Sequence, residues 1–407
     1  MAIHRDEANR DVLQACAILG AFFVVATAGA YLYRLDWNPD IPRDGSTLVI
    51  GRDFLNIWMY GVASSLPDPG QWYDPRIYQR ALASFLGDGY PGQNWSYPPS
   101  LLLLAAPFGR LGYLPALACW TLIGVAIYAV AVFRRFAGWR ALVAALCAPA
   151  AIFCIISGQS SLITAAMLLG IFALLDRRPL VAGVLIGLLT LKPQLGILFP
   201  VMLIASSRWR VFTAAAVIAL ALAALSAALF GPQAWIDFVM RGLPVQNIVL
   251  ADPERIATPF YPTLFMNLRG IGVTYQTAMA VQIVVAFGAA AIVAWAFRAR
   301  AQDRIAADPR QLAALFFACS IAAVPYLLSY DTLPLCLAAL SLMAADELDR
   351  RGRWLTRLIY WLPLLQIGLG TFHIPGPALI APAFALYMFV RLKNQPTEAA
   401  QPLPQPA

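Results

Sequence analysis

Long apolar stretches dominate this chain, and short groups of charged residues, Pro or Gly separate them. A helix that crosses a bilayer needs about 20 mainly apolar residues, and only helices or closed barrels satisfy their backbone polar groups in lipid. The pattern therefore predicts an all-α integral membrane protein, a polytopic helical bundle with about 12 spans. The predicted spans are 12–33, 112–133, 141–157, 160–175, 179–191, 193–207, 211–231, 277–298, 311–329, 332–345, 354–371 and 376–391.

The composition agrees with a membrane protein. Of the 407 residues, 60% are hydrophobic and 12% are charged, whereas soluble domains carry about 25% charged residues. The first stretch, 12–33, follows Arg5 and Arg10 and is longer than the apolar part of a secretory signal peptide. Although 26–28 resembles a cleavage site, we expect an uncleaved signal anchor.

The charges between the spans predict the orientation. With the N-terminus inside, the inner segments carry 19 of the 29 Lys and Arg residues but 10 of the 21 Asp and Glu residues. The positive-inside rule then predicts cytoplasmic N- and C-termini in a bacterial inner (plasma) membrane. Two long segments, 34–111 and 232–276, would face outwards. Because orientation accounts for the net charge of +8, we expect no nucleic-acid partner.

The spans and loops form one predicted domain, 1–393, and the Pro/Gln-rich tail 394–407 is expected to be disordered. The six cysteines lie inside apolar stretches without paired spacing, and the histidines are His4 and His373. This pattern favours neither a disulfide framework nor a metal site. The inner loops are short and contain no Gly-rich phosphate motif, so no nucleotide-binding domain is expected.

Asp53 is the most informative acidic residue, because a segment of the first outer loop with regularly spaced apolar residues begins at this position. Apolar residues recur every three or four positions from 53 to 66, which predicts an amphipathic helix lying along the membrane interface. Asp53 would be its N-cap, a role worth about 0.5–2 kcal/mol, or a general base, and spacing alone does not separate the two. The helix N-terminus and Arg52 should both lower the pKa of Asp53. Arg52 and Asn56 are candidate substrate-binding residues beside it.

Aromatic residues crowd the rest of this loop, and most of them fit an interfacial belt. Tyr97 differs, because Pro98 and Pro99 fix an extended backbone before the apolar run 101–106. That run is too short to span, so we expect a re-entrant or interfacial helix, with Tyr97 at a substrate site.

Two breaks between apolar stretches also carry polar residues. At 157–160 the sequence Ser-Gly-Gln-Ser predicts a tight outer turn, in which Gln159 either completes the hairpin or binds a sugar hydroxyl. At the second break Lys192 stands among apolar residues, followed by Pro193 and Gln194. A cation at the bilayer centre costs about 2.5–3.5 kcal/mol. Lys192 therefore either extends to the interface or binds a phosphate, with Gln194 as a neighbouring candidate.

A second polar group lies towards the C-terminus. Asn267 and Arg269 belong to the outer segment 232–276, and Arg269 is the alternative phosphate ligand. Asp331 lies where one predicted span ends and the next begins, so it must be near the outer face or a cavity. It can pair with Lys192 or Arg269, or contact a substrate. His373 is most simply a turn residue.

Together these residues resemble glycosyltransferase family 87, the polyprenol-phosphate-mannose-dependent α-mannosyltransferase-like membrane proteins of the GT-C class. The resemblance covers about residues 50–270 and extends more loosely to 335. Two features of many members differ here. An Asn-Gln-Ser segment has only Asn267 as its counterpart, and Ser329-Tyr330-Asp331 stands near the position of a later histidine. The matching motifs are, in order, Asp53-Phe54, Tyr73-Asp74, Tyr97-Pro98-Pro99, Gly158-Gln159, and Gly183 leading to Lys192-Pro193.

The resemblance implies a GT-C-like bundle that transfers a hexose, with mannose as the expected sugar, from a polyprenyl-phosphate donor. Asp53 would act as the base, with inversion, on the outer face of the inner membrane. The acceptor would be a membrane lipid or glycan, the donor is a substrate rather than a cofactor, and a divalent cation is compatible with this chemistry. A transporter or flippase of a lipid-linked saccharide is the main alternative. An assembly or scaffold protein would leave Lys192 unexplained.

Overall fold

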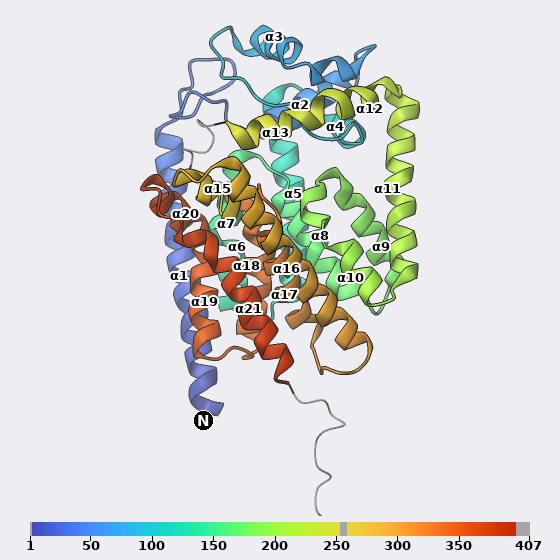
Figure 1. The fold of residues 1–407 in the computed structure, drawn as a ribbon. Helices are drawn as coiled ribbons and strands as arrows, with labels where there is room; N and C mark the ends of the chain where they lie inside the picture. The colour runs from blue at the N-terminus through green and yellow to red at the C-terminus, as the bar shows by residue number, and fades with distance from the viewer. Residues whose placement is uncertain (1, 253–258, 396–407) are drawn as a thin grey trace, which may run out of the picture.

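The computed structural model describes residues 2–252 and 259–395, and the predicted tail 394–407 falls almost wholly outside these ranges. Within them the regular structure is helical, apart from isolated bridges that join Asp36 to Arg43 and Arg43 to Val49. The helices form an upright bundle with a layer of shorter helices across one end, which we call the end layer (Figure 1). The first helix begins and the last helix ends at the opposite end of the bundle (Figure 1).

Five helical segments are long and apolar enough to cross a membrane, by length and composition. They are Glu7–Tyr33 within α1 (Ala2–Tyr33), α5 (Tyr113–Arg135), Trp139–Ser157 comprising α6 (Trp139–Leu146) and α7 (Pro149–Ser157), α11 (Trp209–Phe230) and α16 (Tyr275–Ala301). The other bundle helices are α8 (Ser161–Leu174), α9 (Pro179–Leu188), α10 (Phe199–Ala205), α17 (Pro309–Ala323), α18 (Leu333–Ala344), α19 (Arg350–Tyr360), α20 (Leu362–Thr371) and α21 (Ile380–Lys393), with the short η6 (Gly376–Leu379).

This arrangement confirms an all-helical membrane protein. Every one of the twelve predicted spans overlaps at least one helix, but only five segments have the length and composition of a full crossing. The remaining apolar stretches are broken into shorter helices, as at Lys192-Pro193, where the proline removes a backbone donor. The count of about 12 spans therefore stays a prediction.

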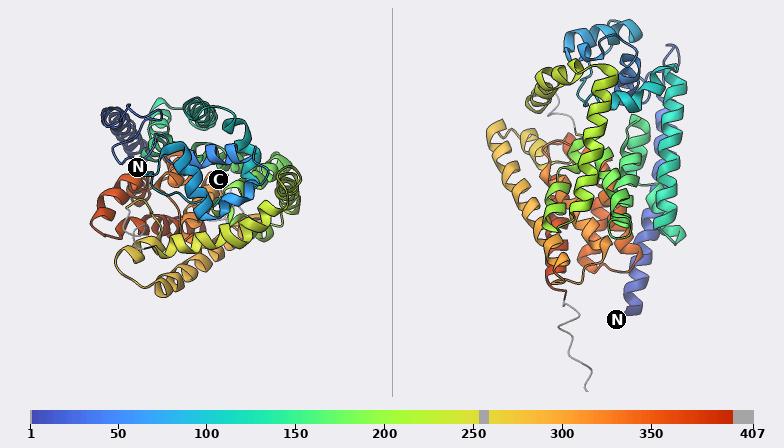
Figure 2. Two further views of the ribbon diagram at one scale, coloured as in Figure 1. Left: turned by 90° about the horizontal axis from the view of Figure 1, so that it is seen from above. Right: turned by 90° about the vertical axis from the view of Figure 1, so that its right-hand side faces the viewer.

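The end layer combines helices from both long segments that were predicted to face outwards. Figure 2 shows this layer lying over the bundle, and η1 packs against both α12 and η4. The helices from the first segment are α2 (Phe54–Ala63), η1 (Pro69–Tyr73), α3 (Pro75–Leu86) and α4 (Leu101–Gly109). The second segment supplies α12 (Gln233–Asp237), the π-helical turn η4 (Phe238–Gly242) and α13 (Leu243–Ala251), and α15 (Leu264–Gly270) lies nearer the bundle.

Helix α2 confirms the predicted helix after Asp53, although it ends at Ala63 rather than 66. Eight of its ten residues are buried, so the amphipathic pattern does not leave a face of this helix exposed, and its position along the membrane interface stays a prediction. Two glycines explain the burial. A Cβ on Gly61 would lie 2.4 Å from the Ala105 carbonyl oxygen, and one on Gly109 would lie 1.9 Å from the Gly61 carbonyl carbon. Helices α2 and α4 therefore touch backbone to backbone.

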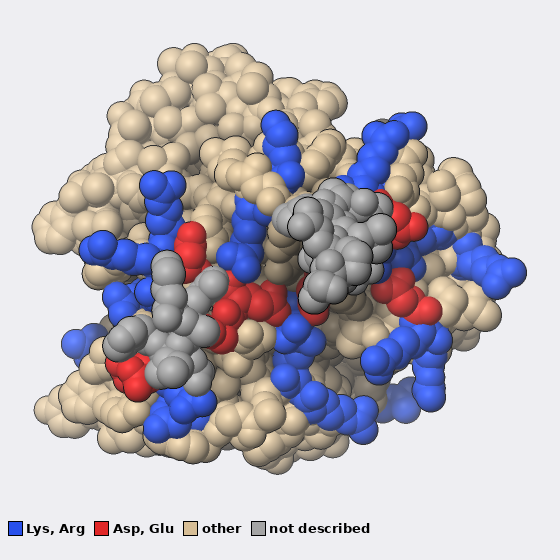
Figure 3. Space-filling view, turned by 90° about the horizontal axis from the view of Figure 1, so that it is seen from below, with Lys and Arg blue, Asp and Glu red and all other residues tan. Residues whose placement is uncertain are grey.

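The end of the bundle away from α2 is rich in basic side chains (Figure 3). Three of the helices carry two basic residues each in their last turns: Arg134 and Arg135 in α5, Arg298 and Arg300 in α16, and Arg391 and Lys393 in α21. The sequence predicts that this end faces the cytoplasm. The end layer would then lie on the outer side.

Candidate active site

The turn between α7 and α8 fixes the start of α2. Gly158 has a left-handed backbone (φ +62°), and an added Cβ would lie 2.5 Å from Cβ of Phe54 and 2.7 Å from the carbonyl oxygen of Gly51. The Asp53 amide donates a hydrogen bond of 2.9 Å to the Ser157 carbonyl. Only glycine allows this close approach, so the turn predicted at 157–160 is also the surface that positions Asp53.

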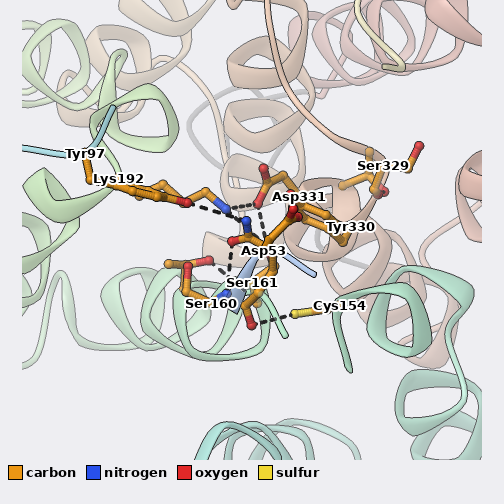
Figure 4. Close-up of polar contacts among 12 residues, drawn as sticks. Asp53, Tyr97, Cys154, Ser160, Ser161, Lys192, Ser329, Tyr330 and Asp331 are labelled. Carbon is orange, nitrogen blue, oxygen red and sulfur yellow. Dashed lines mark hydrogen bonds and ion pairs between the residues drawn. The ribbon is translucent and has the colours of Figure 1, made fainter. Parts of the chain in front are cut away.

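Asp53 occupies the N-cap position of α2, but its side chain makes no cap hydrogen bond. Instead, the Tyr330 hydroxyl donates to the Asp53 carboxylate at 2.8 Å. Tyr330 lies in η5 (Ser329–Thr332), which leads directly into α18. The carboxylate therefore meets side chains from the bundle (Figure 4) rather than the first turn of its own helix. A cap alone does not explain this residue.

Burial raises the pKa of Asp53, even though hydrogen bonds from Tyr330 and Gln159 and the positive charges of Lys192 and Arg52 act to lower it. The predicted lowering of this pKa is therefore wrong, because loss of hydration outweighs the favourable partners. Arg52 itself pairs with Asp44 at 2.5 Å. The residue as a whole is half-buried, while its carboxylate is enclosed by these neighbours.

Lys192 lies at the break between η2 (Leu189–Leu191) and η3 (Pro193–Gly196), and only 5% of the residue is exposed. Its ammonium donates to the Asp331 carboxylate at 2.5 Å and to the Ser161 hydroxyl at 3.4 Å. Ser161 in turn donates to Asp331 at 2.5 Å. Of the two pairings expected for Asp331, the structure shows the one with Lys192. We call these two residues the Lys192–Asp331 pair.

Tyr330 connects Asp53 to this pair. Its hydroxyl contacts the Asp53 carboxylate, and the Lys192 ammonium lies 5.3 Å from the centre of its ring. That distance allows a favourable cation–π interaction. An acidic group and a cation from distant parts of the chain thus share one aromatic neighbour, as Figure 4 shows.

Lys192 also lines an apolar cavity of about 60 Å³, which we call the groove. Tyr97 and Ser160 contribute hydroxyls to its wall, and Gln159 donates to the Tyr97 hydroxyl at 3.4 Å. The apolar walls come from α2, α4, α5, α8, α9 and η2: Ile57, Leu101, Leu104, Trp120, Ile163, Met167, Leu188, Leu189 and Leu191. The structure therefore brings Tyr97, Gln159 and Lys192 together.

Gln194 lies on the other side of Lys192. It lines a second cavity, of about 20 Å³, together with Asp331 and apolar residues of α8, α17 and α18. Lys192 thus lines the groove, whereas its partner Asp331 lines this smaller space. Gln194 is close to the pair without belonging to the groove.

The other candidates make contacts away from the Lys192–Asp331 pair, mostly within their own segments. Asn56 accepts a hydrogen bond of 2.5 Å from the Tyr78 hydroxyl. Asn267 donates to the carbonyls of Tyr261 and Thr263 and pairs with Gln366, while Arg269 donates to the Val273 carbonyl at 2.8 Å. Asn267 and His373 line another cavity of about 20 Å³. These contacts stabilise loops and helix ends, as does the Arg52–Asp44 pair.

Two residues of the site were not among the sequence candidates: Tyr330 and Ser161. Tyr330 stands between Ser329 and Asp331 at the junction of two predicted spans, and Ser161 directly follows the 157–160 turn. Polar residues at such positions are a signal for a site, but the sequence does not show which of them reaches Asp53. Across residues 2–252 and 259–395, no group of three or more His, Cys, Asp or Glu side chains is placed to hold a metal ion.

The fold and the site define a helical membrane protein with an acidic group and a buried cation beside an apolar groove. The model of glycosyltransferase family 87 matches residues 95–325, more than half of the 407 residues. The chain therefore belongs to glycosyltransferase family 87, and it is a membrane glycosyltransferase. The match contains Tyr97, Gln159 and Lys192, while Asp53 and Asp331 lie outside it. No curated protein and no solved structure matches the chain.

Proposed function

We propose that this protein transfers a hexose, most simply mannose, from a polyprenyl-phosphate donor to a hydroxyl of a membrane lipid or glycan. Transfer takes place at the outer face of the inner membrane, with Asp53 as the base. One observation carries the proposal: Tyr330 contacts both the Asp53 carboxylate and the Lys192 ammonium. A base and a phosphate-binding cation are therefore close enough to serve one reaction.

The groove supports a lipid-linked donor. Its walls are almost entirely apolar, and Lys192 is the charged residue that lines it. A prenyl chain would occupy the apolar part, and its phosphate would meet the ammonium as a point charge. A volume of about 60 Å³ is far below the roughly 300 Å³ of ordinary ligand sites. Donor binding must therefore move the groove walls apart.

The chemistry follows from these positions. The acceptor oxygen attacks the anomeric carbon from the face opposite the lipid phosphate, and Asp53 takes the hydroxyl proton. The bond between the anomeric carbon and the phosphate oxygen breaks, and its electron pair stays on the phosphate, where Lys192 stabilises the charge. The configuration at the anomeric carbon is inverted. The raised pKa of Asp53 makes it a stronger base than an exposed carboxylate.

The test is transfer of a labelled sugar from synthetic polyprenyl-phosphate donors in proteoliposomes. Replacing Asp53 by Asn should lower the rate by about 10²–10⁴-fold, the usual contribution of a general base. Asp68→Asn is the matched control, because Asp68 is a conventional N-cap outside these motifs, and its carboxylate accepts from the Gly70 amide at 3.1 Å. That control should retain transfer.

Unchanged transfer by Asp53→Asn would show that Asp53 is not the base. The same vesicles test the flippase alternative, because movement of the lipid-linked sugar across the bilayer can be followed without an acceptor. Movement without transfer, for every donor supplied, would replace the proposed reaction by transport.

A further inference from the structure

The Lys192–Asp331 pair is a neutral unit at the end of the groove. The two side chains are 6% and 2% exposed, and their charged atoms are 2.5 Å apart. A buried pair of this kind adds little net stability compared with well-packed apolar residues, because both charges lose their hydration. Stability alone is therefore a weak reason for placing a carboxylate against the cation that lines the groove.

The pair leaves Lys192 able to bind a ligand. An ammonium group has three N–H donors, and the bonds to Asp331 and Ser161 use two of them. Lys192 lines the groove, whereas Asp331 lines the smaller cavity with Gln194. A phosphate in the groove can thus reach the ammonium while Asp331 keeps its own bonds to Lys192 and Ser161.

The two lipids of the proposed reaction differ in charge. The donor is a phosphodiester with one negative charge. The product, polyprenyl phosphate, is a phosphomonoester that carries close to two charges at pH 7, because its second pKa is about 6. A carboxylate fixed beside the binding cation repels the second charge as well as the first. Asp53, which also contacts Tyr330, adds repulsion of the same sign.

We infer that Asp331 is a specificity residue that lowers the affinity of the site for the dianionic product relative to the monoanionic donor. This inference rests on the proposed function, since it takes Lys192 as the phosphate ligand. Its consequence is that the spent lipid phosphate leaves the site instead of blocking it. Without Asp331 the site would favour the ligand with the larger negative charge.

The test compares the binding of two lipids to the purified full-length protein. The probes are polyprenyl phosphate and its methyl ester, which model the charges of product and donor without requiring catalysis. In the Asp331→Asn variant the ratio of their dissociation constants should shift towards polyprenyl phosphate by about tenfold or more. Ser161→Ala is the matched control, because it removes a hydrogen bond from Asp331 but no charge. It should leave the ratio within about twofold.

Each result has a distinct meaning. If both lipids bind and Asp331→Asn leaves their ratio unchanged, the role of Asp331 is overturned while the donor site stands. If neither lipid binds the wild type, the donor assignment and this inference both fail. Asp331→Asn leaves a buried ammonium without its partner, so the empty protein can be unstable. In that case added polyprenyl phosphate should restore folding more than the methyl ester does, and equal or absent rescue overturns the inference.

Discussion

At the scale of single residues, Tyr330 influences the pKa of the Asp53 carboxyl group. It donates a hydrogen bond of 2.8 Å to the carboxylate and presents its ring to Lys192 at 5.3 Å. A hydrogen bond to the charged form of an acid lowers its pKa, whereas burial raises it. The pKa of Asp53 is raised because burial prevails, and Tyr330 limits the size of that rise.

We expect Tyr330→Phe to shift the pH dependence of transfer. Loss of the hydroxyl removes a bond that favours the charged carboxylate, so the pKa of Asp53 should rise further. The acidic limb of the plot of kcat/KM against pH should move to higher pH, and the rate at any pH on that limb should fall. Steady-state transfer measured from pH 5 to 9 checks both effects.

Tyr128→Phe is the control for this change. Tyr128 is also buried, and its hydroxyl donates to the Ala145 carbonyl rather than to an acid. Its loss should affect stability but not the position of the acidic limb. Equal shifts in the two variants, or none in Tyr330→Phe, would contradict the role given to Tyr330.

The charged carboxylate of Asp53 should also lower the free energy of unfolding at pH 7. Because its pKa is raised in the folded state, the folded protein binds this proton more tightly than the unfolded chain does. The contribution of Asp53 to the free energy of unfolding is therefore most favourable at pH values below its pKa in the unfolded chain. This contribution is lost as the pH rises through its raised pKa in the folded protein. Asp53→Asn should have the higher melting temperature at pH 7, by about 1–2 °C.

Thermal unfolding of wild type and Asp53→Asn in the same detergent, measured over a series of pH values, checks this sign. The difference in melting temperature should shrink as the pH falls, because the protonated carboxyl resembles the amide. A lower melting temperature for Asp53→Asn at pH 7 would show that the charged form is stabilised after all. A stability gain together with lost transfer is the usual signature of a functional buried acid.

At the scale of elements, the contact between α2 and the α7–α8 turn holds the acid in place. Gly158 is the critical residue, since its φ of +62° and its closeness to Phe54 and Gly51 exclude a side chain. We expect Gly158→Ala to lower the free energy of unfolding by about 1–3 kcal/mol. It should also reduce transfer strongly, because the start of α2 has to move.

Gly138→Ala is the matched control for this element. Gly138 precedes α6 with φ −98°, and an added Cβ would meet no atom within 4 Å. Thermal unfolding and transfer assays of the two variants distinguish loss of the contact between Gly158 and the start of α2 from a general effect of replacing a glycine by alanine. Normal activity in Gly158→Ala would mean that Asp53 does not depend on this turn.

The elements also show where sequence reasoning succeeds and where it stops. Apolar length and breaks at Pro and Gly predict the helices, including the one that follows Asp53 and the interruption at Lys192. The sequence also offers Asp331 as a partner for Lys192 or Arg269, because a buried cation needs an anion nearby, and the fold shows the pairing with Lys192. It does not predict the burial of α2, which depends on contact between Gly61 and Gly109. Tyr330 is separated from Asp53 by 277 residues, so their contact and the sign of the pKa shift follow only from the fold.

At the scale of the whole molecule, the position of the site depends on which end of the bundle faces the cytoplasm. Three helices whose last turns contain two Arg or Lys residues each end on the side of the bundle away from α2 (Figure 3). Short loops rich in Lys and Arg stay on the cytoplasmic side when a protein is inserted into the membrane. Asp53 belongs to the opposite end, where the end layer lies (Figure 1). The proposed use of a lipid-linked donor follows from that orientation, because nucleotide sugars are confined to the cytoplasm.

Labelling of single cysteines with a membrane-impermeant maleimide tests this orientation. In a background without the six native cysteines, Gly89→Cys lies on an exposed part of the end layer and should react in intact spheroplasts. Gln302→Cys, exposed directly after the basic end of α16, should react only after the membrane is opened. The reverse pattern would place Asp53 on the cytoplasmic side. A nucleotide-linked donor would then be within reach, and the charged groups of the site would have to be reassigned to a different leaving group.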